Sequence, residues 1–369
     1  MTPAAIPVSV ITGFLGAGKT TLLNRLLREP ELADALVIVN EWGEIGLDHL
    51  LIERVESDVI LLASGCLCCS LRGDLVDALR DLAARRADGR IGAFNRIVIE
   101  TSGLADPAPI LHAIMADREL AGRYRLAGVV TLVDAVNGAA TLRNADEAAR
   151  QAALADLLAI AKSDLLDPAD RAAKLGALDA ALRRLNPGAP VLDVAAGEFS
   201  AADLIALDLS DGSGAALRLV EPPAEVHPRA VAADVYLRPS ERHRADIRAY
   251  SLRLPKPVAD QAFALFMALL GAALGPKLLR VKGLIALAEN PAEPLVIHGV
   301  QHILHPPRRL RRWPDADRAT RIVIIADGLD RARIEALWAA LAGAPRLDAP
   351  DLAALTASPL SPARSGLFS

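Results

Sequence analysis

The sequence predicts an α/β fold, with a first domain built on a mostly parallel sheet and a smaller α+β domain after it. In the first half, the β-rich runs are continuously apolar, which is typical of strands buried on both faces. Helical patterns that begin at proline or polar residues separate these runs, as in a parallel sheet with crossover helices. The chain has 369 residues, of which 52% are apolar, so it can build two hydrophobic cores.

Strands and helices alternate along this first half. The predicted strands are 6–12, 35–40, 96–100, 127–134 and 157–160. The predicted helices are 19–28, 71–86, 107–116 and 168–185. A further apolar run at 59–62 leads into the second of these helices, so the residues between them form a strand-to-helix turn.

The alternation stops at a segment rich in Asp, Ser and Gly, and Pro222 and Pro223 follow it. We therefore expect the first domain at 1–210, a linker at 211–228 and a second domain at 229–345, with a loosely ordered tail at 346–369. The second domain is predicted to contain strands at 231–237, 246–254, 278–287, 294–304 and 320–326, and helices at 258–274 and 330–342.

Composition restricts the location and the partners. The net charge is −4 and no long basic block occurs, so nucleic acid is not an expected partner. No uncharged run approaches the roughly 20 residues that span a bilayer, and the start lacks the features of a signal peptide. Three cysteines lie too close in sequence to pair, which favours a reducing compartment, and we expect a cytoplasmic protein. Monomer and homodimer both remain open.

A phosphate-binding loop occupies residues 13–20, which fit the pattern Gly-x-x-x-x-Gly-Lys-Thr between a strand and a helix. Such glycines let consecutive N–H groups point at phosphate oxygens, and the helix N-terminus adds its dipole. Lys19 is predicted to reach the β- and γ-phosphates, and Thr20 to offer its hydroxyl to Mg²⁺. The residues predicted to bind nucleotide here are Gly13, Gly16, Ala17, Gly18, Lys19, Thr20 and Thr21.

A second polar segment follows the strand at 96–100. Glu100 is predicted to support Mg²⁺ or its water, and Gly103 to let a backbone N–H contact the γ-phosphate. We therefore group Glu100 with Lys19 and Thr20 as the predicted catalytic residues. An ordinary strand-ending glutamate is the alternative for Glu100.

Lys162 and Asp164 follow the strand at 157–160. A carboxylate can accept two hydrogen bonds from guanine, and a lysine stem can lie over the base, which favours GTP over ATP. Ala161 stands where the usual Asn-Lys-x-Asp motif has asparagine. A helix cap explains the same residues, and an ATP-using small-molecule kinase is the corresponding alternative function.

The three cysteines, Cys66, Cys68 and Cys69, are predicted to bind a soft or borderline cation. They precede a helix, whose dipole lowers thiol pKa values, and so short a loop leaves a tetrahedral ion open to another ligand. Small buried cysteines are the alternative. Candidates to complete the site, or to organise Mg²⁺, are Glu41, Glu44, Asp48 and His49.

His298, His302 and His305 also suggest a metal site. On a strand, His298 and His302 share one face while His305 points to the other. We favour an ordinary role in the sheet or at its surface.

Taken together, these motifs resemble the CobW family of phosphate-loop GTPases, relatives of the HypB and UreG nickel-insertion proteins. The resemblance rests on 13–21, 40–48, 65–69, 72–75, 100–107, 133–135 and 162–164, with 279–283 and 299–301 in the second domain. Trp42 stands where the family usually has phenylalanine, and Ala161 departs from the guanine motif.

The resemblance implies a GTP-hydrolysing metallochaperone with a Rossmann-like phosphate-loop GTPase domain and a CobW-type C-terminal domain. It implies that the Cys-x-Cys-Cys loop, with Glu41 or a client residue, binds Zn²⁺ or Co²⁺ and passes the metal to a client metalloprotein under nucleotide control. Two alternatives remain, a metal-binding scaffold or buffer with negligible turnover, and cobalt delivery in cobalamin synthesis.

Overall fold

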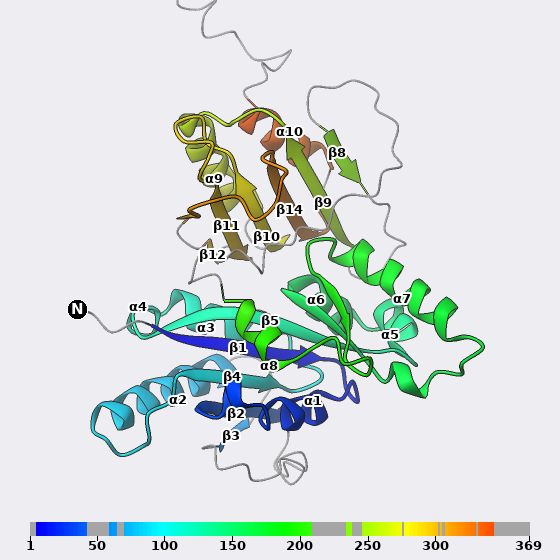
Figure 1. Cartoon of the computed structure of the whole chain (residues 1–369). Coiled ribbons are helices and arrows are strands. Elements are labelled where there is room, and N and C mark those ends of the chain that lie inside the picture. Colours follow the sequence, from blue (N-terminus) through cyan, green and yellow to red (C-terminus); the bar gives the residue numbers. More distant parts are fainter. Residues whose placement is uncertain are drawn as a thin grey trace, which may run out of the picture.

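The computed structural model describes residues 5–42, 59–64, 70–208, 234–237, 246–274, 277–301, 303–304, 307–329 and 331–342. Figure 1 shows two sheets, one above the other, each with its own helices. Among the described residues no helix is long and apolar enough to cross a membrane.

The first sheet is entirely parallel over its described strands. Its order is β3-β2-β4-β1-β5-β6-β7. The strands are β1 (Ile6–Gly13), β2 (Ala35–Trp42), β3 (Val59–Ser64), β4 (Arg96–Thr101), β5 (Tyr124–Asp134), β6 (Leu157–Ala161) and β7 (Val191–Asp193).

Helices cover both faces of this sheet. Alternate strand residues belong to two different cores: Val10 and Ile97 pack on one face, whereas Ile11 and Val98 pack on the other. Helices of the first face are α2 (Ser70–Ala87), α3 (Ala108–Ala116), α4 (Arg118–Ala121), α5 (Gly138–Asn144), α6 (Asp146–Leu154) and α7 (Arg171–Leu185). Those of the second are α1 (Lys19–Leu26) and α8 (Ala201–Ala206), and short 3-10 helices lie at η1 (Pro30–Leu32) and η3 (Ser163–Leu165).

The second sheet is antiparallel. Its order is β12-β11-β10-β14-β9-β8, and β13 also pairs with β11. The strands are β8 (Asp234–Leu237), β9 (Ile247–Leu254), β10 (Leu278–Ile285), β11 (Leu295–Val300), β12 (Ile303–Leu304), β13 (Arg308–Arg309) and β14 (Thr320–Asp327). Helices α9 (Asp260–Leu274) and α10 (Arg331–Leu341) pack on one face, around Phe266 and Trp338.

The opposite face of the second sheet joins the core of the first domain. On β14, Ile324 packs with α9 and α10, whereas Val323 and Ile325 belong to the core of the first domain. A register shift between Leu278 and Arg280 interrupts the alternation of β10. The two sheets therefore share one continuous apolar core.

The predicted fold class is confirmed, and most predicted elements agree with the structure within a few residues. Two differences matter. The predicted strand 294–304 is divided into β11 and β12, because Gln301 adopts the left-handed backbone conformation with φ 49°. Helices α5 and α6 were not predicted. The predicted linker at 211–228 and tail at 346–369 lie outside the described residues.

Candidate nucleotide-binding site

The phosphate loop connects the end of β1 to the start of α1. Gly16 and Gly18 have φ values of 73° and 97°, in the left-handed region that favours glycine. A Cβ atom at Gly13 would lie 2.5 Å from the carbonyl oxygen of Leu132, so a side chain there would displace β5. The backbone thus takes the curled path that turns N–H groups toward a phosphate.

Lys19 and Thr20 begin α1 and meet Glu100 from the end of β4. The Lys19 ammonium donates to the carbonyl oxygens of Gly13 at 2.9 Å and Phe14 at 3.4 Å, at the mouth of the loop. The Thr20 hydroxyl donates to Glu100 Oε1 at 2.7 Å, although 80 residues separate them. A hydroxyl beside a carboxylate is an oxygen donor set that suits Mg²⁺. Thr21 is exposed on the same helix turn.

Gly103 lies directly against the phosphate loop. A Cβ atom on Gly103 would be 2.6 Å from the backbone nitrogen of Leu15, a separation that side chains do not reach. Only glycine allows this approach without displacing one of the two segments. The loop after β4 therefore contacts the place where a γ-phosphate is expected.

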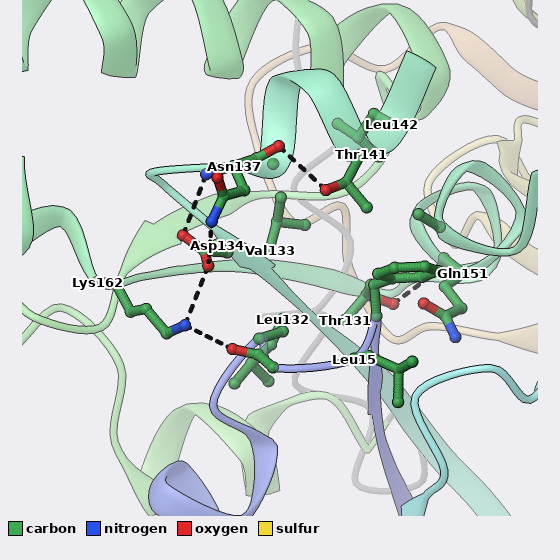
Figure 2. Close-up of a pocket in the computed structure, with 15 residues that line it drawn as sticks. Leu15, Thr131, Leu132, Val133, Asp134, Asn137, Thr141, Leu142, Gln151 and Lys162 are labelled. Atoms are coloured by element: carbon green, nitrogen blue, oxygen red, sulfur yellow. Dashed lines mark hydrogen bonds and ion pairs between the residues drawn. The ribbon is translucent and has the colours of Figure 1, made fainter. Parts of the chain in front are cut away.

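Lys162 is fixed at two points on the far side of the loop (Figure 2). Its ammonium donates to the Gly16 carbonyl at 2.6 Å and to Asp134 Oδ2 at 3.0 Å. Burial alone would raise the pKa of Asp134, but the hydrogen bonds from Lys162 and from the Val136 and Asn137 amides hold that pKa below its usual value. Asp134 therefore keeps the lysine stem against the phosphate loop.

Asp164 lies on η3 and is exposed. The turn that carries it is tied to the end of β7, because the Ser163 hydroxyl donates to Asp193 Oδ1 at 2.7 Å. Asp193 Oδ1 also accepts from the amides of Ala195 and Ala196, at 2.9 and 3.2 Å. These bonds place the loop after β7 beside the predicted base-binding residues, a proximity that the sequence analysis missed.

A cavity of about 240 Å³ opens beside the phosphate loop. Phe14, Leu15 and Lys162 line it together with the end of β5 and with α5 and α6. Figure 2 shows Leu15 and Lys162 among the lining side chains. Gln151 of α6 also lines the cavity and is fully buried. Its side-chain amide donates to the carbonyl oxygens of Gly103 at 3.1 Å and Ala105 at 3.0 Å. Gln151 was not among the predicted site residues, because α6 itself was not predicted.

The predicted metal ligands are described only in part. Glu41 lies on β2, and its backbone pairs in register with Ala63 of β3, one residue before that strand ends. Cys66, Cys68 and Cys69 lie outside the described residues, as do Glu44, Asp48 and His49. Among the residues that the structure does describe, no group of three or more His, Cys, Asp and Glu side chains could hold a metal ion.

The chain is similar to known proteins over nearly its whole length. Residues 7–193 match the family described as "CobW/HypB/UreG, nucleotide-binding domain", and residues 247–342 match the "Cobalamin synthesis protein cobW C-terminal domain". The zinc chaperone YjiA of Escherichia coli is 34% identical over 91% of this chain and 98% of its own length. The zinc chaperone CobW of Pseudomonas aeruginosa is 32% identical, with 90% of each chain covered.

A solved structure extends this similarity to three dimensions. The Zn(II)-bound YjiA GTPase of E. coli superimposes with a TM-score of 0.63 at 28% identity, covering 93% of this chain and 100% of the other. Both domains and the order of motifs around the phosphate loop thus agree with one family, and the chain belongs to the CobW/HypB/UreG family.

Proposed function

We propose that this protein hydrolyses GTP and that hydrolysis controls the transfer of zinc to a client metalloprotein. The observation that carries the proposal is the meeting of Lys19, Thr20 and Glu100 at the phosphate loop, with Gly103 packed against it. The E. coli relative described as a GTPase shares this fold, which supports the same activity here.

Each of these residues has a distinct part in the reaction. Lys19 and the loop amides would bind the β- and γ-phosphates, while Thr20 and Glu100 would hold Mg²⁺, which neutralises charge that develops during phosphoryl transfer. Water attacks the γ-phosphorus, the bond to the β–γ bridging oxygen breaks, and GDP and phosphate leave. The Gly103 amide would stabilise charge on the γ-phosphate oxygens.

The choice of GTP rests on Lys162 and Asp164. The exposed Asp164 carboxylate would accept hydrogen bonds from the guanine edge, and the Lys162 stem would lie against the base. Ala161 supplies no amide side chain to this site, so we expect a preference for GTP over ATP that depends mainly on Asp164.

The metal site would comprise Cys66, Cys68 and Cys69, with Glu41 or a client residue as the further ligand. Thiolates in this number favour zinc, and both curated relatives named above are zinc chaperones. A second structure of YjiA is described as zinc-bound although one glutamate and two cysteines are replaced by alanine. Zinc content alone therefore does not identify the cysteine loop as the site.

Steady-state hydrolysis of GTP and ATP tests the enzymatic part. The wild type should prefer GTP, and Glu100→Gln should lower kcat by about 100-fold or more while GDP affinity changes little. Lys19→Ala should remove turnover. Turnover that stays at background with zinc and client present would instead favour a metal-binding scaffold or buffer.

Competition with a chromophoric zinc chelator tests the metal part. Zinc affinity should differ between the GDP and GTP-analogue states, and the triple Cys→Ser variant should lose that difference even where it keeps other zinc sites. The same titration with Co²⁺ tests the alternative of cobalt delivery. Equal zinc affinity in both nucleotide states and in the triple variant would contradict the proposal.

A further inference from the structure

Helix α6 lies between the loop that touches the phosphate loop and the sheet of the second domain. Its residue Gln151 faces the loop after β4. The buried side-chain amide donates to the carbonyl oxygens of Gly103 and Ala105, and the backbone carbonyl of Gln151 accepts from the Thr131 hydroxyl at 2.8 Å. One side chain thus fixes two carbonyls of the segment that approaches the phosphate loop.

The neighbouring residue, Arg150, faces the second domain. Its guanidinium bonds to Asp327, at the end of β14, with Nη2 and Oδ2 2.8 Å apart. The same guanidinium lies 3.8 Å from Asp106 Oδ2, in the loop that Gln151 holds. Arg150 therefore stands between a carboxylate of that loop and a carboxylate of the second sheet.

The far end of α6 is anchored to the same sheet. Asp156, two residues after the helix, is buried and pairs with both Arg280 and Lys282 of β10. Its other oxygen accepts from the Val129 amide at 2.9 Å. Charge contacts with the second sheet therefore come from the middle of α6, at Arg150, and from just beyond its C-terminal end, at Asp156.

We propose that Gln151 and Arg150 are positioning residues for GTP hydrolysis, through which the second domain sets the loop at 103–106. The inference rests on the proposed GTPase activity. Gln151 holds Gly103 at the distance from the phosphate loop that hydrolysis requires, and Arg150 joins this arrangement to β14. By linkage, a partner that shifts the second domain on α6 changes the turnover of GTP, and bound nucleotide changes affinity for that partner.

The ion pair between Arg150 and Asp327 has a matched control within the second domain. Arg253 pairs with Asp317 at 3.0 Å, and the exposures of the two side chains, 36% and 28%, are close to the 37% and 25% of Arg150 and Asp327. Asp317→Asn therefore removes a similar ion pair that lies away from α6. The kcat of Asp317→Asn therefore shows how much turnover changes when an ion pair of similar exposure is lost elsewhere in the protein.

The experiment measures kcat, KM, GDP affinity and thermal melting for each variant. The variants are Gln151→Leu, Arg150→Met, Asp327→Asn, the double variant that combines Arg150→Met with Asp327→Asn, and the control Asp317→Asn. We expect kcat to fall about fivefold to tenfold in Arg150→Met and Asp327→Asn and further in Gln151→Leu, with GDP affinity within about twofold. The double variant should be no slower than the slower single variant. Asp317→Asn should keep kcat within about twofold of the wild type.

Several outcomes would overturn the inference. One is a wild type that hydrolyses GTP in a Lys19-dependent way while Asp327→Asn and Asp317→Asn have the same kcat. Another is a double variant in which the two losses multiply. If Arg150→Met fails to fold, Arg150→Lys with Asp327→Asn provides the same comparison. A wild type without Lys19-dependent turnover would contradict the proposed function itself, and the inference with it.

Discussion

Lys162 illustrates how a single side chain depends on a distant partner. Its backbone is left-handed, with φ 61°, and its ammonium bridges the Gly16 carbonyl and the Asp134 carboxylate. Asp134 also accepts from the amides of Val136 and Asn137, at 2.7 and 3.3 Å. The carboxylate thus organises the end of β5 and the position of the lysine together.

Replacing Asp134 with Asn should weaken nucleotide binding. The amide cannot form an ion pair with Lys162, so we expect the affinity for a fluorescent GDP to fall about threefold to tenfold, as for a partly exposed charged hydrogen bond. Asp170→Asn, which breaks the exposed pair between Asp170 and Lys174, is the control and should leave affinity unchanged.

The same pair gives an expected pH dependence. Because the pKa of Asp134 in the folded protein lies below its ordinary value, the contribution of the carboxylate is complete above that ordinary value and is lost only as the pH falls through the lower one. GDP titrations should therefore give the same difference between wild type and Asp134→Asn at pH 5 and pH 8. A difference that disappears by pH 5 would refute this role of Asp134.

At this scale the sequence predicts what is local. The phosphate-loop motif at 13–20 is contiguous in the sequence, so Lys19 and Thr20 could be predicted from it. Glu100 was predicted from its position at the end of a strand. Gln151 lies 48 residues from Gly103, and Asp134 lies 28 from Lys162. Nothing in their immediate neighbourhoods indicates these partners, because the contacts form only when the strands assemble.

At the scale of elements, β10 combines an apolar strand with two buried cations. The register shift near Leu279 places both Leu279 and Arg280 on the side of the first domain. Burial would raise the pKa of Asp156, but Arg280 and Lys282 more than offset it and hold that pKa well below its usual range. Burial lowers the pKa of Lys282, although Asp156 acts against that shift.

Replacing Asp156 with Asn should strongly destabilise the protein. Two buried cations would lose the carboxylate that pairs with both of them, and such losses cost about 3–5 kcal/mol in the free energy of unfolding. Urea denaturation measures this value. Asp179→Asn, at a surface pair within α7, should change it by less than about 1 kcal/mol. Replacing Arg280 and Lys282 with methionine in the Asp156→Asn background should restore much of the loss.

Acid should act through the same carboxylate. The pKa of Asp156 is lower in the folded than in the unfolded chain, so its stabilisation is complete above about pH 4 and falls as the pH drops toward the folded-state value. The stability curves of wild type and Asp156→Asn should converge only in that acidic window. Convergence at neutral pH would show that the carboxylate does not hold this interface together.

Among the elements, α5 and α6 are the helices around the cavity that the sequence did not predict. The buried positions of α6 include Ala148, Ala149, Ala152 and Ala153, and alanine is common on exposed helix faces too, so few large apolar side chains indicated a buried face. The continuous apolar runs of β1, β4 and β5 were easier to recognise, since burial on both faces leaves few polar positions.

At the scale of the whole molecule, the two domains are not independent bodies over their described residues. Val323 and Ile325 of β14 belong to the core of the first domain, and a Cβ atom on Gly188 would lie within 3.5 Å of Val323. The sequence predicted two cores from composition, but it could not predict that one face of the second sheet joins the core of the first domain. The outward face of a strand has no signature that distinguishes a partner domain from a helix.

We therefore expect the two domains to unfold together. Of the three tryptophans, Trp313 and Trp338 lie in the second domain and Trp42 lies on β2 of the first. Tryptophan fluorescence of a Trp42→Phe variant therefore reports on the second domain, while release of a fluorescent GDP reports on the first. In urea the two transitions should coincide. Ile325→Ala should lower the free energy of unfolding obtained from either signal by about 2–5 kcal/mol, and the two transitions should still coincide. Separate midpoints for the two signals would contradict a shared core.

The pairing of Asp156 with Arg280 and Lys282 also limits how such a chain can be recombined. Consider a chimera that joins this nucleotide-binding domain to the second domain of a relative. It would keep the buried Asp156 carboxylate but lose its cations wherever the relative lacks the equivalents of Arg280 and Lys282. Domain exchange therefore has to transfer positions 156, 280 and 282 together. A chimera that ignores them would have an unpaired buried charge between its domains, however well each domain folds in its parent protein.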